Sequence, residues 1–340
     1  MNLYLTPPIL IMTFLAAICA GPALSADISH CKNIGNPSAR LACYDQAAGI
    51  VDEILQDQAI AADAESMAAA DVVVESSTPF SDRIAREEAI MNSPFALIPH
   101  YRNYILPVTY NSKINEEPFT DAFPGVEMDD IEAKFQISFK VRMLENLIGN
   151  GDLWAGYTQQ NWWQVYNDDE SAPFRETNYE PEIVMAWDNH WQIAGLTNTG
   201  ITFGFNHQSN GRGELLSRSW NRIIAGATFE KQNFAARLRV WHRIEESESD
   251  DDNPNMEKFY GHGDLMMAYH WGNHEFAALI RNNLRFDGGN KGALQLDWTF
   301  PLNERFNWYI QYFYGYGESL IDYDVKSSRI GIGFAMNNLF

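Results

Sequence analysis

The sequence of 340 residues carries a formal net charge of −21, with 45 acidic against 24 basic side chains. This charge argues against nucleic acid as a partner, because phosphates require a basic binding surface, and it is compatible with cation binding. Aromatic residues make up 13% of a chain in which 20% of residues are charged. Many of these aromatics must therefore have a role outside a conventional core.

The N-terminal segment has the features of an export signal. It contains no Lys, Arg, Asp or Glu and includes an apolar run from Ile9 to Ala20. The segment ends in small residues, so a secretory signal peptide is predicted over residues 1–26. No later stretch contains eighteen consecutive apolar residues, so no membrane-spanning helix is expected.

Residues 27–91 are predicted to form an N-terminal periplasmic extension, rich in Ala, Asp, Glu and Ser. The stretch from Ala59 to Ser77 reads as low complexity, which indicates a partly helical or disordered segment. Cys31 and Cys43 are separated by eleven intervening residues, and an isolated pair in an exported protein favours a disulfide over a metal site. The extension is not expected to carry chemistry.

Beyond Pro94 apolar and polar residues alternate with a period of two. In "KFQISFKVRM" (Lys134–Met143) the odd positions are apolar and the even positions are polar or charged, as in a strand with one apolar face. About twelve segments of this kind follow one another, each near the length that crosses a bilayer when tilted. They are 103–111, 132–144, 152–165, 181–189, 199–209, 219–230, 234–244, 257–271, 274–285, 293–301, 305–316 and 328–340.

Short and long connections between these segments alternate. The short ones are 145–151, 231–233, 272–273 and 302–304, and the longer ones are 112–131, 166–180, 210–218, 245–256, 286–292 and 317–327. The second set is mostly longer than the first, and the connection 190–198 breaks this length rule but not the order of alternation. Outer-membrane barrels have short periplasmic turns and long outer loops. The sequence therefore predicts an all-β fold over residues 92–340, a twelve-stranded antiparallel transmembrane β-barrel in the cell outer membrane.

One predicted strand end carries an unusual set of polar side chains. In "GITFGFNHQSN" (Gly200–Asn210) His207 and Ser209 share the parity of the apolar residues before them, and Asn221 does the same on the next strand. All three are predicted to point toward lipid, where unpaired polar groups are costly. His-x-Ser alone is a weak signal that ordinary rim polarity also explains. The third residue on the neighbouring strand favours a hydrolytic site, since a serine nucleophile needs a base and the base needs an orienting group.

Four stretches resemble the calcium-dependent, dimer-activated outer-membrane phospholipase A family of Gram-negative bacteria. They are "NHQSNGRGELLSRSWNR" (Asn206–Arg222), "YTQQNWWQVYN" (Tyr157–Asn167), "SAPFRETNYEPE" (Ser171–Glu182) and "YGYGESLIDYD" (Tyr314–Asp324). The resemblance spans about residues 92–340 and implies the same twelve-stranded barrel. It also implies hydrolysis of phospholipid acyl esters at the A1 and A2 positions, with lysophospholipids as further substrates.

The resemblance also implies roles for the polar cluster. Ser209 matches the nucleophile, His207 the general base and acid, and Asn221 the residue that orients the imidazole. Gly211 matches the position whose backbone N–H helps hold the oxyanion. The segment between Gly213 and Leu216 differs from the family pattern, so a secondary calcium site is doubtful there.

The cofactor and the partner that the resemblance implies are calcium (Ca²⁺) and a second copy of the chain. Ser217 and the carbonyl of Arg212 match calcium ligands, and Ser171 matches the ligand that the second subunit of an active homodimer supplies. Gln159, an outward amide on a spanning strand, matches a position in the dimer interface. A residue near the membrane boundary would explain Gln159 equally well.

Two other functions fit the residues without the resemblance. The first is a passive channel, suggested by basic residues that face the lumen: Lys134, Lys140, Arg142, Arg237 and Arg239. The interior of a twelve-stranded barrel is narrow, however, so paired charges are expected to fill it. The second is a catalytically inactive surface-binding barrel that uses acidic outer loops. The favoured hypothesis is a phospholipase embedded in the outer membrane, with its site near the outer leaflet.

Overall fold

The computed structural model describes residues 31–34, 40, 43, 44, 83, 87, 89, 90 and 96–340, the last range without 248, 250, 338 and 340. The predicted signal peptide, the low-complexity stretch and most of the predicted extension lie outside these residues. The chain divides into two units, Met1–Glu75 and Ser76–Phe340. In the first, η1 (Cys31–Asn33) is a single 3₁₀ turn, and Cys31 is joined to Cys43 by the disulfide that the sequence favoured.

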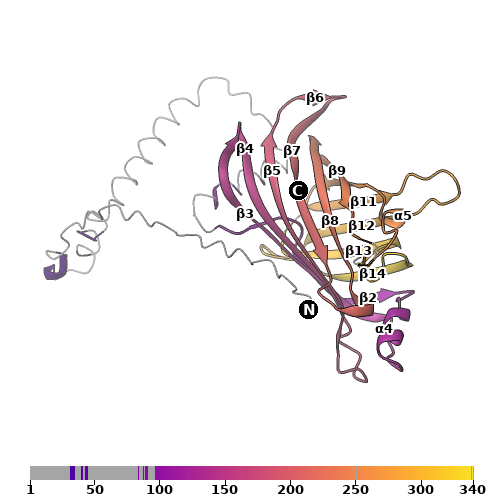
Figure 1. The fold of residues 1–340 in the computed structure, drawn as a ribbon. Helices are drawn as coiled ribbons and strands as arrows, with labels where there is room; N and C mark the ends of the chain where they lie inside the picture. Colours follow the sequence, from indigo (N-terminus) through magenta and orange to yellow (C-terminus); the bar gives the residue numbers. More distant parts are fainter. Residues whose placement is uncertain are drawn as a thin grey trace, which may run out of the picture. The chain divides into compact units, whose positions relative to one another are not determined.

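Within residues 96–340, twelve long strands form one antiparallel sheet that closes on itself. Each pairs with the next along the chain, and β14 pairs with β2 to complete the ring, so the predicted barrel is confirmed (Figure 1). The strands are β2 (Tyr104–Asn111), β3 (Ile131–Ile148), β4 (Gly151–Trp163), β5 (Phe174–Asp188), β7 (Leu196–Ser209), β8 (Ser219–Lys231), β9 (Phe234–Ile244), β10 (Gly263–Trp271), β11 (His274–Asn282), β12 (Gly292–Pro301), β13 (Asn307–Tyr316) and β14 (Lys326–Ala335).

Two strands begin six or more residues away from their predicted starts. β5 begins at Phe174 rather than near 181, so half of the predicted loop 166–180 is strand. The polar residues that occupy its inward positions, such as Glu176 and Asn178, hide the alternation on which the prediction depended. The segment 257–262 was predicted as strand but contains a short helix, α5 (Glu257–Tyr260).

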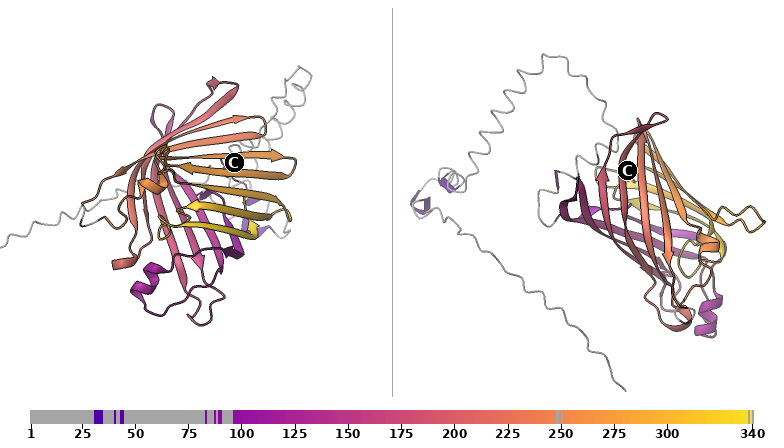
Figure 2. Two further views of the ribbon diagram at one scale, coloured as in Figure 1. Left: turned by 90° about the vertical axis from the view of Figure 1, so that its right-hand side faces the viewer. Right: turned by 45° about the horizontal axis from the view of Figure 1, so that its top comes forward.

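The two ends of the barrel differ as predicted. Long connections lie at one end together with α4 (Glu117–Ala122), η2 (Glu214–Leu216) and α5, while short turns lie at the other (Figure 2). The long connection near residue 190 is explained by a small hairpin in which β6 (Gln192–Ile193) pairs with the start of β7. A second two-residue strand, β1 (Ile98–Pro99), pairs with β3.

The two faces of the sheet carry opposite chemistry. Many large apolar side chains on the outer face are exposed, for example Phe203 at 54% and Ile332 at 49%, which suits contact with lipid. The inner face is polar. No helix in the described residues is long and apolar enough to span a membrane.

Charge pairs occupy the lumen, as predicted for the narrow interior of a twelve-stranded barrel. Lys134 Nζ lies 2.9 Å from Glu318 Oε1, and Arg239 Nη2 lies 2.7 Å from Asp264 Oδ2. Lys140, near the opposite end, pairs with Glu87 of the preceding segment at 2.9 Å. Arg142 lies 3.3 Å from Asp152. Arg237 instead stacks on the ring of Tyr101.

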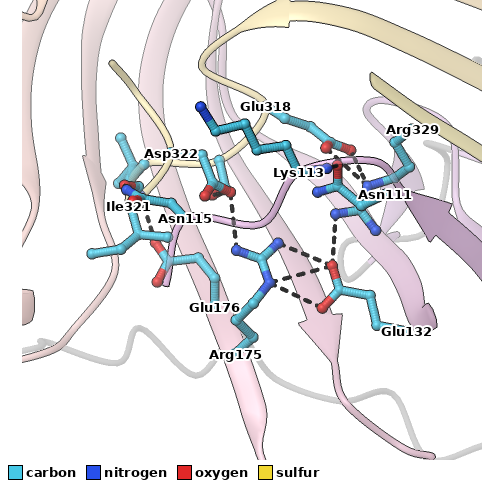
Figure 3. Close-up of polar contacts among 12 residues, drawn as sticks. Asn111, Lys113, Asn115, Glu132, Arg175, Glu176, Glu318, Ile321, Asp322 and Arg329 are labelled. Carbon is cyan, nitrogen blue, oxygen red and sulfur yellow. Dashed lines mark hydrogen bonds and ion pairs between the residues drawn. The ribbon is translucent and has the colours of Figure 1, made fainter. Parts of the chain in front are cut away.

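A buried ionic network holds the outer end of the barrel together (Figure 3). Arg175 donates to Glu132 and Asp322 at 3.0 Å each. Arg329 joins Glu132 to Glu318, the latter in the loop after β13. Burial alone would raise the pKa of Glu318, but Arg329 and Lys134 hold that pKa at about 2. The network therefore anchors β3, β5 and the last outer loop to one another.

Candidate active site

The predicted triad residues lie on β7 and β8, which are adjacent in the barrel. In their register His207 faces Asn221, and Ser209 faces Ser219. His207 Nδ1 lies 2.9 Å from Asn221 Oδ1, within hydrogen-bond distance. An antiparallel pair of strands thus brings together two residues that are fourteen positions apart in the sequence.

These side chains are on the outer face of the barrel. Even-numbered neighbours on the same strand, Asn206 and Gln208, are buried on the lumen side and bond to Arg222 and Trp220. His207, Ser209 and Asn221 have the opposite parity and are partly exposed. Lipid-facing Phe205 and Ile223, 43% and 41% exposed, lie next to them. The site is thus located where the outer end of the strands meets the apolar band.

The hydrogen bond to Asn221 determines which imidazole nitrogen can act as a base. An amide oxygen only accepts hydrogen bonds, so His207 Nδ1 donates to Asn221 Oδ1, and in the neutral imidazole Nε2 is the nitrogen that can accept a proton. Among the described residues, the Ser209 hydroxyl makes no hydrogen bond, to His207 or to any other group. Such contacts are often loose until a substrate is bound.

Gly211 follows Ser209 in a tight loop. Its φ of +64° lies in the left-handed region that favours glycine. A Cβ atom added there would come within 3.1 Å of the ring of Tyr179, which projects from β5 opposite Ser209. The backbone conformation therefore favours glycine at this position, and the nearby ring leaves little room for a larger side chain.

The loop between β7 and β8 is held by polar contacts within the loop and by contacts with β5. Asn210 Nδ2 donates to the carbonyl of Leu216 at 2.7 Å, and Asn210 Oδ1 accepts from the backbone N–H of Arg218 at 3.0 Å. Arg212 Nη2 donates to the carbonyls of Phe174 and Arg175 at 2.8 Å each. The loop that surrounds Ser209 is therefore held against β5.

The residues matched to calcium ligands are placed as follows. Ser217 Oγ donates to Asp252 Oδ2 at 2.5 Å, which places a carboxylate beside the hydroxyl, and Arg212 belongs to the same loop between β7 and β8. These are the hard oxygen donors that calcium prefers. Ser171 is exposed on the loop before β5, and none of the described contacts joins it to Ser217. In residues 96–340 as described, no group of three His, Cys, Asp or Glu side chains could hold a metal.

Gln159 belongs to a row of polar groups on the outer face of β4. Tyr157 Oη donates to Gln159 Oε1, and Gln159 Nε2 donates to Asn161 Oδ1, both at 2.8 Å. Thr177 on β5 also donates to Asn161 at 3.1 Å. The buried Nδ2 of Asn161 has no hydrogen-bond partner in the described part of the chain. This row lies on the same side of the barrel as the candidate site, since Gln159 pairs with Tyr179 and Tyr179 pairs with Ser209.

Sequence reasoning missed two carboxylates beside the site, Asp252 and Glu246. Asn221 Nδ2 donates to Glu246 Oε1 at 3.2 Å. Both acidic residues belong to the loop after β9, which is rich in Glu and Asp. Their contacts depend on how this loop folds back over β8. The alternation of apolar and polar residues in the sequence does not predict that path.

The fold and the site together define a class: an integral outer-membrane β-barrel with a serine and a paired His–Asn on its lipid-facing rim. A family model described as Phospholipase A1 matches residues 80–336. Phospholipase A1 of Escherichia coli (strain K12) is 36% identical over 250 residues, which cover 73% of this chain and 84% of that protein. Phospholipase A1 of Klebsiella pneumoniae is 37% identical over 250 residues, with 73% and 85% covered.

Two solved structures agree with this assignment. Outer membrane phospholipase A from Escherichia coli matches with a TM-score of 0.69 at 35% identity, covering 74% of this chain and 97% of that one. The Salmonella typhi outer membrane phospholipase, a dimer with bound calcium, matches with a TM-score of 0.70 at 33% identity, covering 74% and 97%. The chain belongs to the phospholipase A1 family of outer-membrane enzymes.

Proposed function

We propose that this phospholipase cleaves acyl esters of phospholipids and lysophospholipids, at both the A1 and A2 positions, with Ser209, His207 and Asn221 as its triad. The observation that carries the proposal is the hydrogen bond of 2.9 Å between His207 and Asn221 on the lipid-facing side of the barrel. Polar groups in that position cost free energy, so a function must retain them. An ester bond at the level of the lipid glycerol would meet them directly.

The reaction follows from the protonation of His207. The Ser209 hydroxyl attacks the ester carbonyl while Nε2 of His207 accepts its proton, and the imidazolium then gives that proton to the departing glycerol oxygen. Water hydrolyses the acyl-serine by the same route and releases the fatty acid. The backbone N–H of Gly211 is proposed to donate to the oxyanion of each tetrahedral intermediate.

Calcium fits the oxygen donors around this loop. Ser217 Oγ and the carbonyl of Arg212 would hold the ion, with the partner subunit's Ser171 as a further ligand, and Asp252 lies 2.5 Å from Ser217. When bound, calcium supplies positive charge that stabilises the oxyanion. The role of this chain would be to supply these oxygen ligands and to keep them close to Ser209.

The active form is proposed to be a homodimer in the membrane. Ser171 is exposed, and none of the described contacts joins it to Ser217 of the same chain. Both facts are expected if Ser171 supplies its oxygen to the calcium site of the second subunit. The polar row that contains Gln159 is on the same side of the barrel, so one interface would cover both. The Salmonella typhi relative is described as a dimer with bound calcium, which supports the proposal.

Fatty-acid release from mixed micelles tests the function. We expect the parent to be active with calcium and inactive with a chelator, and Ser209→Ala to lose activity by at least about a thousandfold. Ser328→Ala is the matched control, since Ser328 lies on the outer face of β14, opposite Tyr314. Equal activity in the parent and Ser209→Ala would refute the triad. Conductance across a planar bilayer without lipid hydrolysis would favour a channel. The absence of both conductance and hydrolysis would favour a surface-binding barrel.

A further inference from the structure

A fourth side chain, that of Glu246, lies beside the three candidate triad residues. The amide of Asn221 contacts His207 through Oδ1 and Glu246 Oε1 through Nδ2, at 2.9 and 3.2 Å. Glu246 comes two residues after the end of β9, the strand next to β8. The carboxylate therefore lies on the far side of the amide from the imidazole.

We infer that Glu246 is a positioning residue for the triad, an inference that rests on the proposed function. A free asparagine amide can turn either its oxygen or its NH₂ toward a histidine. An NH₂ donor would require Nδ1 to accept, which would place the proton on Nε2 and prevent it from receiving the proton of Ser209. A carboxylate only accepts, so Glu246 binds the NH₂ and turns Oδ1 toward His207. The basic nitrogen is thereby fixed as Nε2.

Glu246 is itself held in place. Its side chain is 18% exposed, and Oε2 lies 3.7 Å from Nη2 of Arg243. Arg243 is 6% exposed and is gripped in turn by Asp251 at 2.5 Å and Glu257 at 3.5 Å. The carboxylate of Glu246 therefore lies between this guanidinium, at ion-pair distance, and the amide of Asn221. The folded acidic loop therefore controls the orientation of Asn221.

The three side chains form one chain of hydrogen bonds, from Glu246 through Asn221 to His207. Hydrogen bonds in such a chain strengthen one another where the dielectric constant is low. The orientation of Asn221 is therefore supported from both sides of its amide.

The docking of the loop does not depend on Glu246 alone, so the position can be tested without unfolding the site. Asn253 Oδ1 accepts from the backbone N–H of Ser219 at 3.0 Å, and the Asn253 carbonyl accepts from Arg243 at 3.3 Å. Both bonds remain when Glu246 is replaced. The neighbouring Glu245 is exposed and serves as the matched control.

The experiment measures kcat and KM for fatty-acid release with saturating calcium in the full chain. Glu246→Ala is expected to lower kcat about tenfold with little change in KM, because the lost bond acts only through the base. Glu246→Gln, whose side-chain oxygen still accepts from Asn221, should restore most of this loss. Glu245→Gln should match the parent. In an Asn221→Ala background, Glu246→Ala should have no further effect.

The outcomes separate the inference from the function on which it rests. If the parent is active and Ser209→Ala is not, but Glu246→Ala keeps the parental kcat, only the inference fails. An equal tenfold loss in the Asn221→Ala background would also overturn it, since the effect would not pass through Asn221. A parent without activity would instead refute the proposed function.

Discussion

At the residue scale, the candidate site is a compromise between membrane insertion and chemistry. His207 and Asn221 satisfy each other by a hydrogen bond, and Glu246 takes the remaining amide donor. The Ser209 hydroxyl has no bond among the described residues, so it is the member of the candidate triad that is open to a substrate.

Ser217 is the residue through which calcium binding can be tested. Ser217→Ala should raise the calcium concentration for half-maximal activity about tenfold, because one ligand oxygen is lost. Ser217→Thr keeps the hydroxyl and should remain close to the parent. The measurement is a calcium titration of fatty-acid release at fixed micelle concentration. A lower maximal rate with an unchanged calcium midpoint would show that Ser217 is not a ligand.

Much of the site could be predicted at this scale, because strand parity is a local property. Alternation alone placed His207, Ser209 and Asn221 on the outer face, and their resemblance to a known family suggested their roles. Glu246 and Asp252 could not be found in this way. Their contacts with Asn221 and Ser217 depend on the path of a long loop, and acidic composition does not specify a path.

At the element scale, β7 approaches β5 closely at one glycine. A Cβ atom on Gly204 would lie 2.2 Å from the carbonyl oxygen of Ile183 and 2.7 Å from Val184 Cα. At Gly200, on the same strand face, the nearest atom would be the carbonyl oxygen of Trp187 at 3.7 Å, an ordinary contact. The absence of a side chain at Gly204 therefore permits the close approach of the strand that carries the site.

Gly204→Ala should accordingly destabilise the barrel by about 1–3 kcal/mol, as overpacking does. Gly200→Ala, the matched control, should leave the free energy of unfolding close to that of the parent. Unfolding in detergent micelles, followed by tryptophan fluorescence against denaturant, measures the difference. Equal stability of the two variants would mean that the strands separate locally without cost.

The elements themselves were predictable where one face met lipid and the other met the lumen with a clear alternation. β5 was predicted too short because Pro181 and several polar residues occupy positions where a strand usually shows apolar ones. α5 was mistaken for the beginning of β10, although its Tyr260 packs as a helical residue against buried Trp220. In both cases tertiary contacts overrode the local pattern.

At the scale of the whole molecule, association of two barrels should depend on the polar row of β4. Gln159→Ala should weaken the dimer about threefold to tenfold, the range expected for one hydrogen bond within a membrane. Gln160→Ala is the matched control, since Gln160 points into the lumen and bonds to Gln136 at 2.7 Å. Sedimentation of detergent-solubilised protein with calcium measures the association. Equal weakening by both variants would show that the effect is not specific to the outer face.

The candidate catalytic groups face lipid from the side of the barrel. Neither the phospholipid nor the released fatty acid therefore has to cross water in the proposed reaction. A released fatty acid and its lysolipid would stay in the leaflet where they form and would disturb its packing there. Uncontrolled release of these products would therefore damage the membrane in which the barrel is embedded.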